Sequence, residues 1–112
     1  MSRLTPDQHL ASDPRRNIFV SANAGSGKTH VLVARVSRIL LSSVAPSKIL
    51  CLTYTKAAAS EMQSRLFKSL GRWSILSEAE LTSELDDLMP LGRPRTEEEL
   101  RKARALLSLI HI

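Results

Sequence analysis

The chain contains 112 residues, of which 43% are hydrophobic, and its formal net charge is +5 at pH 7. This length suits one small globular domain, and the composition excludes a collagen-like or an intrinsically disordered chain. The positive charge mildly favours an anionic partner, but charged residues of both signs are spread along the chain, and a solvated surface explains the excess equally well.

The first predicted element is a buried strand over residues 17–22, "NIFVSA", which contains β-branched and aromatic residues and lies between breakers and glycines. A helix is predicted from Lys28 onward, because apolar residues recur there at helical spacing. These apolar residues are Leu32, Val36, Ile39 and Leu40. Arg35 and Arg38 fall between them and are expected to point away from the core.

A second buried strand is predicted over residues 48–55, "KILCLTYT", which shows almost no polar alternation. Cys51 lies inside this run, where a small buried thiol is a better expectation than a metal ligand or a nucleophile. Strand, helix and strand in this order predict a right-handed crossover between parallel strands, and therefore an α/β fold.

Three further helices are predicted after the second strand. The first begins near Lys56 and ends with "LGRW" at residues 70–73, and its apolar residues share one side: Met62, Leu66 and Leu70. The next two are predicted from capping boxes, in which a hydroxyl residue and a glutamate satisfy each other's backbone N–H groups: Ser77 with Glu80, and Thr96 with Glu99. Residues 90–95, "PLGRPR", are predicted to be the loop between these two helices.

The predicted sheet is too small to stand alone, because two parallel strands cannot bury themselves in water without further strands. The sequence also stops at residues 108–112, "SLIHI", inside an apolar helical pattern. We therefore expect the chain to be the first piece of a larger protein. No signal-peptide core is present, and no apolar run approaches the roughly 20 residues of a membrane span, so we expect a cytoplasmic protein without a membrane partner.

The stretch from Val20 to His30, "VSANAGSGKTH", joins the first predicted strand to the helix that follows it. It fits the phosphate-loop pattern G-x-x-x-x-G-K-[ST], with Ala22 in the place of the first glycine. Glycines let backbone N–H groups converge on phosphate oxygens, and the positive end of the following helix adds to the attraction. The pattern predicts that Lys28 reaches the β- and γ-phosphates of a nucleotide and that Thr29 offers its hydroxyl to Mg²⁺. The alternative is a plain turn that contains a chance lysine.

The variant A-x-A-G-S-G-K-T resembles the phosphate loop of superfamily 1 DNA helicases of the UvrD/Rep type. Residues 52–66, "LTYTKAAASEMQSRL", resemble the next motif of that family, in which the end of a strand passes into an alanine-rich helix. Upstream, "LTPDQ" places Gln8 where the family has an adenine-recognising glutamine. A side-chain amide carries both a donor and an acceptor, which suits the edge of adenine. An exposed polar residue without a role is the alternative for Gln8 taken alone.

This resemblance implies the N-terminal part of a RecA-like ATP-binding domain, with the motifs in residues 4–73 and a truncated helical segment in residues 74–112. It implies ATP and Mg²⁺ as cofactors. The implied nucleotide-binding residues are Gln8, Ala22, Asn23, Ala24, Gly25, Ser26, Gly27, Lys28, Thr29 and His30. Lys28 and Thr29 are the implied catalytic residues, and Thr29 is also the implied Mg²⁺ ligand.

Within the family, the chain is similar to the recombination helicase-nucleases AddA and RecB, because Thr55 is followed directly by "KAAASEM", without the asparagine that UvrD and Rep carry. It looks most like the N-terminus of AddA, which acts in double-strand break repair. The resemblance implies that single- or double-stranded DNA is a partner, contacted by Thr53, Tyr54, Thr55 and Lys56. Hydroxyls and a positive charge suit phosphate contacts, and an aromatic face that stacks on a base contributes about 1–3 kcal/mol. For Tyr54, an aromatic residue that fills the end of a strand is the alternative.

The carboxylates and the arginine that complete hydrolysis in such enzymes have no candidate in the sequence. Asp86 and Asp87 form an acidic pair, but we do not expect a metal site there, because they lie on a capped helix with an apolar side of Leu81, Leu85 and Leu88. The histidines show no metal-ligand spacing: His9, His30 and His111.

We therefore expect the N-terminal segment of an ATP-driven DNA helicase, with 3′-to-5′ polarity, a role in double-strand break repair and an AddB-like partner protein. The segment is expected to be inactive on its own. Two other hypotheses stay open: a different phosphate-loop ATPase or kinase, and a non-catalytic nucleotide- or DNA-binding module that is complete at this length.

Overall fold

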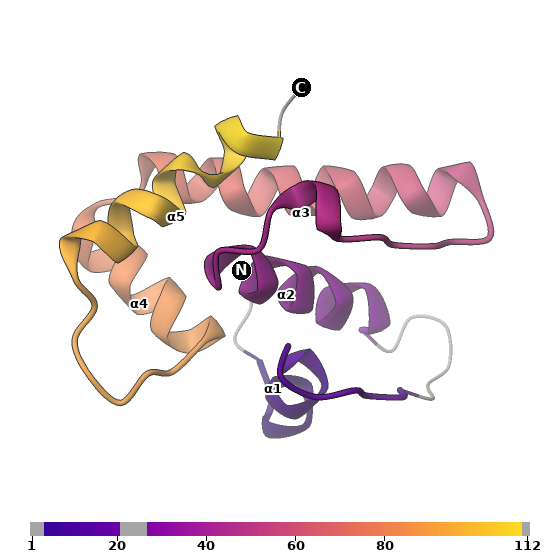
Figure 1. Ribbon diagram of the computed structural model, residues 1–112, viewed down its shortest axis with the longest axis horizontal. Coiled ribbons are helices and arrows are strands. Elements are labelled where there is room, and N and C mark those ends of the chain that lie inside the picture. The colour runs from indigo at the N-terminus through magenta and orange to yellow at the C-terminus, as the bar shows by residue number, and fades with distance from the viewer. Residues whose placement is uncertain (1–3, 21–26, 111–112) are drawn as a thin grey trace.

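The computed structural model describes residues 4–20 and 27–110, and all regular structure within these residues is helical (Figure 1). In chain order the elements are α1 (Pro6–Ser12), α2 (Lys28–Leu41), the short 3₁₀ helix η1 (Pro46–Lys48), α3 (Lys56–Ile75), α4 (Glu78–Leu88) and α5 (Glu97–Ile110). Helices α2 and α3 begin at the residues that the sequence predicts, and the predicted loop at residues 90–95 is confirmed.

The α/β fold predicted from two parallel strands is wrong, because the described residues contain no strand. A strand is held by a ladder of hydrogen bonds to a neighbouring strand. Within the described part of the chain, no backbone hydrogen bond joins residues 17–20 to residues 48–55. The apolar side chains that the prediction placed inside a sheet are instead exposed: 92% for Phe19, 81% for Leu50 and 83% for Leu52.

The second of these runs is extended without being paired. One set of its side chains lines an apolar groove against α2 and α3: Ile49, Cys51 and Thr53. The alternate set is exposed: Leu50, Leu52 and Tyr54. This two-residue period is that of a strand, so the sequence predicts the local conformation and fails on the pairing. Cys51 is exposed, so the expectation of a buried thiol is wrong, although partial desolvation in the groove raises the pKa of the thiol.

Hydroxyl side chains cap the starts of α1, α3, α4 and α5. The hydroxyl in each case accepts a hydrogen bond from the backbone N–H three residues later, at 3.0 to 3.2 Å, and the capping residues are Thr5, Thr55, Ser77 and Thr96. Both predicted capping boxes are confirmed, since Glu80 and Glu99 accept in return from the cap N–H groups. Such a cap contributes about 1 kcal/mol. Helix α2 begins differently, at Gly27, which has no side chain to offer.

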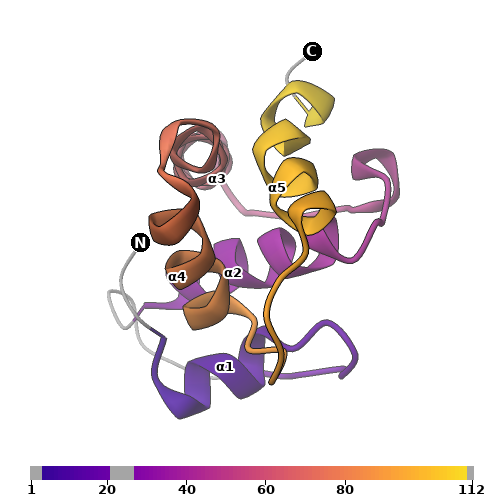
Figure 2. The same cartoon turned by 90° about the vertical axis from the view of Figure 1, so that its left-hand side faces the viewer.

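One hydrophobic cluster joins α2, α3, α4 and α5. Helix α5 lies beside α3, as the view along α3 in Figure 2 shows, and α2 lies beneath α3 (Figure 1). The predicted apolar side of α4 is buried in this cluster: Leu81, Leu85 and Leu88. The buried face of α2 differs from the prediction, because Leu32 is exposed while Val33 and Ala34 are buried. Within residues 4–20 and 27–110, no helix is long and apolar enough to cross a lipid bilayer.

Arginine side chains from neighbouring elements cap the C-terminal ends of two helices. Arg104 of α5 donates a hydrogen bond to the carbonyl of Trp73 near the end of α3, at 3.2 Å. Arg95, whose side chain is almost fully buried, donates to the carbonyls of Leu85 and Met89 at the end of α4. A guanidinium fits these places because the last carbonyls of a helix lack partners within it and form the negative end of its dipole. Part of the positive charge of the chain therefore stabilises the fold.

Candidate nucleotide-binding site

The candidate site lies at the start of α2, where Lys28 is exposed and Thr29 and His30 are half-buried. Gly27 precedes them with a φ of +90°, a left-handed conformation that glycine adopts without strain. The predicted loop residues Ala22, Asn23, Ala24, Gly25 and Ser26 lie outside the described residues. The first turn of α2 contains no acidic residue, so its N–H groups and the positive end of the helix dipole lie beside the charge of Lys28. This arrangement suits an anion such as a phosphate.

Gln8 lies next to this turn, although the two are far apart in sequence. Its Oε1 atom accepts a hydrogen bond from the backbone N–H of Thr5 at 3.0 Å, which completes the capping box of α1. Its Nε2 atom lies 3.3 Å from the position that a Cβ atom on Gly27 would occupy. The structure thus brings the predicted adenine-recognising amide to the start of the predicted phosphate-binding helix. Any residue larger than glycine at position 27 would crowd that amide.

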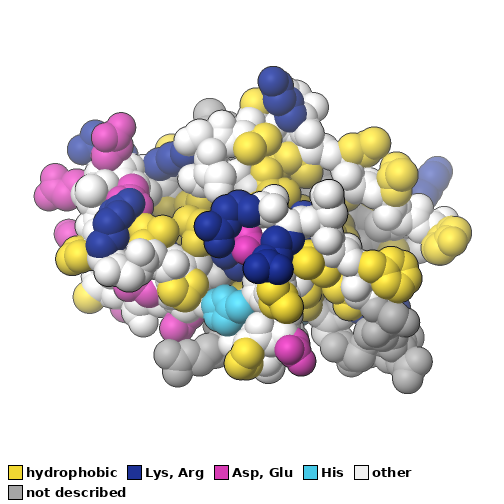
Figure 3. All heavy atoms as spheres, turned by 60° about the horizontal axis from the view of Figure 1, so that its bottom comes forward, with side chains coloured by type: hydrophobic (Ala, Val, Ile, Leu, Met, Phe, Trp, Pro, Cys, Tyr) yellow, Lys and Arg dark blue, Asp and Glu magenta, His cyan; other side chains and the backbone are white. Residues whose placement is uncertain are grey.

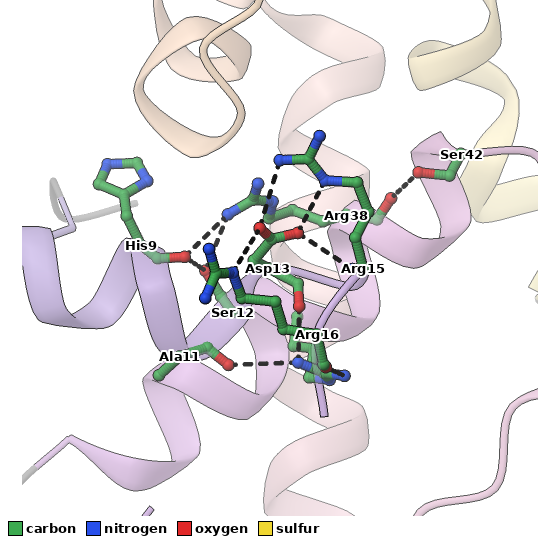
Figure 4. Close-up of polar contacts among 9 residues, drawn as sticks. His9, Ala11, Ser12, Asp13, Arg15, Arg16, Arg38 and Ser42 are labelled. Carbon is green, nitrogen blue, oxygen red and sulfur yellow. Dashed lines mark hydrogen bonds and ion pairs between the residues drawn. The ribbon is translucent and has the colours of Figure 1, made fainter. Parts of the chain in front are cut away.

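Two arginines of α2 fasten α1 to it (Figure 4). Arg35 donates hydrogen bonds to the carbonyls of Ala11, Asp13 and Arg16, at 3.4, 2.8 and 2.6 Å. Arg38 is buried and donates to the carbonyl of His9 at 3.1 Å and to the hydroxyl of Ser12 at 3.2 Å. The expectation that both arginines point away from the core is therefore wrong for Arg38, and Arg35 also turns toward α1.

The sequence contained a signal for these contacts that periodicity alone does not use. The pair Asp13–Pro14 ends α1 at its seventh residue, because the residue before a proline disfavours helical geometry. The last carbonyls of so short a helix then need donors from elsewhere in the fold. Arginines spaced three residues apart on the next helix are suitable donors, but only the tertiary structure shows that they reach that far.

Asp13 anchors the turn that follows α1. Its carboxylate accepts hydrogen bonds from the backbone N–H and from Nε of Arg15, at 3.0 and 3.2 Å, and Arg16 lies 3.8 Å away. The hydrogen bonds from Arg15, side chain first, lower the pKa of Asp13 to about 2. On the face of the molecule that carries α1, Lys and Arg side chains flank an acidic one, with a His side chain beside them (Figure 3).

We predict that the fold loses stability between about pH 5 and pH 2. Two carboxylates have lowered pKa values of about 2 in the folded chain: Asp13, and Glu99, whose Oε1 accepts a hydrogen bond from Arg93 at 2.7 Å. A carboxylate whose pKa is lower in the folded state stabilises it above the unfolded pKa, and this stabilisation is lost as pH falls through the folded pKa. Thermal melts followed by circular dichroism from pH 6 to pH 2 test this. The melting temperature should fall with acid, and Asp13→Asn should reduce the fall; a melting temperature independent of pH would refute the prediction.

The predicted DNA-contacting residues surround the start of α3. The hydroxyl of Thr55 caps α3 by accepting from the N–H of Ala58 at 3.0 Å, and Thr53 donates to the carbonyl of Thr55 at 3.1 Å. Lys56 is exposed, and Tyr54 is fully exposed, which contradicts the alternative of an aromatic residue that fills the end of a strand. The starts of α2 and α3 lie at the same end of the molecule (Figure 1).

The acidic pair on α4 is not arranged to hold a metal ion. Asp86 accepts a hydrogen bond from Nε of Arg95 at 2.9 Å, so it forms an ion pair with the arginine that caps its own helix. Among the described residues, no three His, Cys, Asp or Glu side chains gather closely enough to hold a metal ion. Any Mg²⁺ ligand from the described part of the chain would therefore be a hydroxyl such as that of Thr29, alongside phosphate and water oxygens.

Comparisons with known proteins place these features in a family. Residues 4–105 match the family model described as the UvrD/REP helicase N-terminal domain. The AddA component of the ATP-dependent helicase/nuclease of Lactobacillus acidophilus is 48% identical over 71 residues, which are 62% of this chain and 6% of that protein. The corresponding proteins of Streptococcus sanguinis and Latilactobacillus sakei are 51% and 46% identical over 65 and 69 residues, which are 58% and 61% of this chain.

The chain spans only a small part of these relatives, since the matched regions are 5% of the Streptococcus sanguinis protein and 8% of the Latilactobacillus sakei protein. No solved structure matches it. The resemblance predicted from the phosphate-loop and downstream motifs is confirmed, both for the UvrD/Rep type and for AddA. Because the family model covers nearly the whole chain, the chain belongs to the UvrD/REP helicase N-terminal domain family.

Proposed function

We propose that the chain is the ATP-binding N-terminal part of a longer DNA helicase that acts in double-strand break repair. The observation that carries this proposal is the position of the Gln8 amide beside Gly27, at the helix start that Lys28 and Thr29 form. A base-reading amide and a phosphate-binding turn must be close in space to bind the two ends of one nucleotide. Membership of a helicase family and the names of the relatives support the same assignment.

In this proposal the start of α2 binds the phosphates of ATP. Residues 22–26 complete the loop, Lys28 neutralises charge on the β- and γ-phosphates, and the N–H groups of the first turn of α2 donate to phosphate oxygens. The hydroxyl of Thr29 would be the protein's ligand to Mg²⁺, a fit supported by its half-buried position beside Lys28. When bound, Mg²⁺ bridges phosphate oxygens and neutralises the charge that develops on them during hydrolysis.

The start of α3 is the proposed contact with DNA. The exposed ring of Tyr54 is free to stack on a base, and the ammonium of Lys56 lies two residues away, where it suits a phosphate. Thr53 and Thr55 already use their hydroxyls within the chain, so their contribution to DNA binding would be shared with the cap of α3. A nucleotide site and a DNA site at one end of the molecule would allow each to sense the other.

The remaining features concern the complete protein and rest on the relatives. Because these relatives are named as one component of an ATP-dependent helicase/nuclease, we propose an AddB-like partner protein and 3′-to-5′ movement on DNA. We also propose that the 112 residues alone do not hydrolyse ATP, because the catalytic carboxylates and the arginine that such hydrolysis uses have no candidates in the described residues.

Two changes at Gln8 should reduce the preference for ATP over GTP by about tenfold, the effect of losing one hydrogen bond to the base. Gln8→Ala removes the whole amide. Gln8→Glu keeps the oxygen that caps α1 but removes the NH₂ donor, since glutamate is also a normal partner in a capping box. Competition binding of ATP and GTP to the complete protein, expressed from its own gene, measures the ratio.

Asp7→Ala, one residue away and also exposed, is the matched control and should keep the wild-type ratio. An unchanged preference in both Gln8 variants would show that the base is read elsewhere. A fall in Gln8→Ala but not in Gln8→Glu would attribute the effect to the capping box and not to the amide donor.

A further inference from the structure

Helix α1, which carries Gln8, has little apolar surface to hold it in place. It has 7 residues, and the only fully buried one is polar, Ser12. Leu10 is half exposed, and the nearest buried apolar residue is Leu4, just before the helix. A helix of this length is not stable on its own in water. Its position must therefore depend on the polar contacts made by its neighbours.

Arg35 and Arg38 supply those contacts from α2. Together their guanidinium groups donate to four carbonyls and one hydroxyl in the last turn of α1 and the residues after it. The planar fork of a guanidinium suits several acceptors at once, and the positive charge lies at the negative end of the α1 dipole. Neither arginine lies in the first turn of α2, where the phosphates are expected to bind.

The two ends of α1 therefore contact two different parts of α2. At the C-terminal end the arginines hold the last carbonyls (Figure 4), and at the N-terminal end the Gln8 amide lies beside Gly27. Because α1 is a short rigid rod, the clamp at one end determines where the amide lies at the other. A shift of α1 by even one or two ångströms would separate the amide from the base while leaving Lys28 in place.

We propose that Arg35 and Arg38 are positioning residues for adenine recognition, which hold Gln8 in register with the phosphate-binding start of α2. This inference rests on the proposed function of Gln8 and Lys28. It assigns to two residues that do not touch the nucleotide a part in choosing its base. Selectivity for ATP would then depend on the packing of α1 against α2, and not only on the amide itself.

The test is a double-mutant cycle in the complete protein, expressed from its own gene, with ATP, GTP and inorganic tripolyphosphate as probes. Arg35→Ala should lower the ratio of ATP to GTP affinity about tenfold, as Gln8→Ala does, and should leave tripolyphosphate binding unchanged. In a Gln8→Ala background, Arg35→Ala should lower the ratio no further, because both changes remove the same interaction. Arg35→Lys, which keeps the charge but not the fork, should restore part of the preference.

Arg104→Ala is the matched control, because Arg104 also caps the end of a helix with its guanidinium, but at α3. It should lower thermal stability without changing the ATP to GTP ratio. The inference is overturned if Arg35→Ala keeps the wild-type ratio, if it weakens all three probes equally, or if its effect adds to that of Gln8→Ala. Should Arg35→Ala fail to fold, Arg35→Lys decides between a lowered ratio and an unchanged one. Failure of the proposed function is distinct, since Lys28→Ala would then leave tripolyphosphate binding intact.

Discussion

Replacing Lys28 by alanine should abolish ATP hydrolysis by the complete protein, with turnover lowered at least about a hundredfold, or about 2.7 kcal/mol of transition-state stabilisation. Lys28 is exposed at the first turn of α2, where no acidic side chain offsets its charge. Its ammonium would lie against the phosphate oxygens as negative charge develops on them during transfer. Steady-state phosphate release at saturating ATP and DNA measures the effect.

The matched control for Lys28→Ala is Lys68→Ala, because Lys68 is also an exposed lysine on a helix but lies in the middle of α3. It should keep the wild-type turnover. Circular dichroism of both variants should match the wild type, since neither lysine is buried. Wild-type turnover in Lys28→Ala would rule out a phosphate-binding role for the start of α2.

Replacing Trp73 by alanine should cost about 3–5 kcal/mol of folding free energy, the usual range for removing a buried aromatic side chain. Trp73 is 0% exposed and is the largest fully buried side chain of the core that α2, α3, α4 and α5 share. Its removal leaves a cavity that helices held by long-range contacts fill poorly. Urea denaturation of the chain, followed by far-ultraviolet circular dichroism, gives the free energy of unfolding.

Ile75→Ala is the matched control for Trp73→Ala, because Ile75 lies two residues further along the same helix and is 82% exposed. It should change stability by no more than about 0.5 kcal/mol. Trp73→Phe should cost less than Trp73→Ala, since the indole Nε1 is buried without a hydrogen-bond partner among the described residues. Equal unfolding free energies for Trp73→Ala and Ile75→Ala would contradict the core described above.

Local signals in the sequence account for the helices. The spacing of Met62, Leu66 and Leu70 and the caps Ser77 and Thr96 are properties of a few neighbouring residues, and the helices form where these signals predict them. The error in the fold class arose from residues 48–55, whose extended backbone and two-residue alternation are those of a strand. Pairing is a property of the neighbour and not of the run itself, so composition could not decide it.

The candidate site divides in the same way. The turn at Gly27, Lys28 and Thr29 could be located from sequence, because it is one continuous motif at the start of a helix. The contacts of Arg35 and Arg38 join residues 22 to 29 positions apart, and hydrophobic periodicity does not reveal such pairs. The adjacency of Gln8 and Gly27 could be expected only through the family resemblance, and the structure supplies its distance.

The most direct test of the account is the ATPase rate of the complete protein, expressed from its own gene, with and without a single-stranded DNA oligonucleotide. If the start of α2 binds ATP and the start of α3 binds DNA, turnover should rise severalfold when DNA is added, and the rise should weaken with salt as phosphate contacts are screened. A turnover rate that is the same with and without DNA, or the absence of ATP hydrolysis under both conditions, would contradict the proposal that this chain belongs to the motor of a DNA helicase.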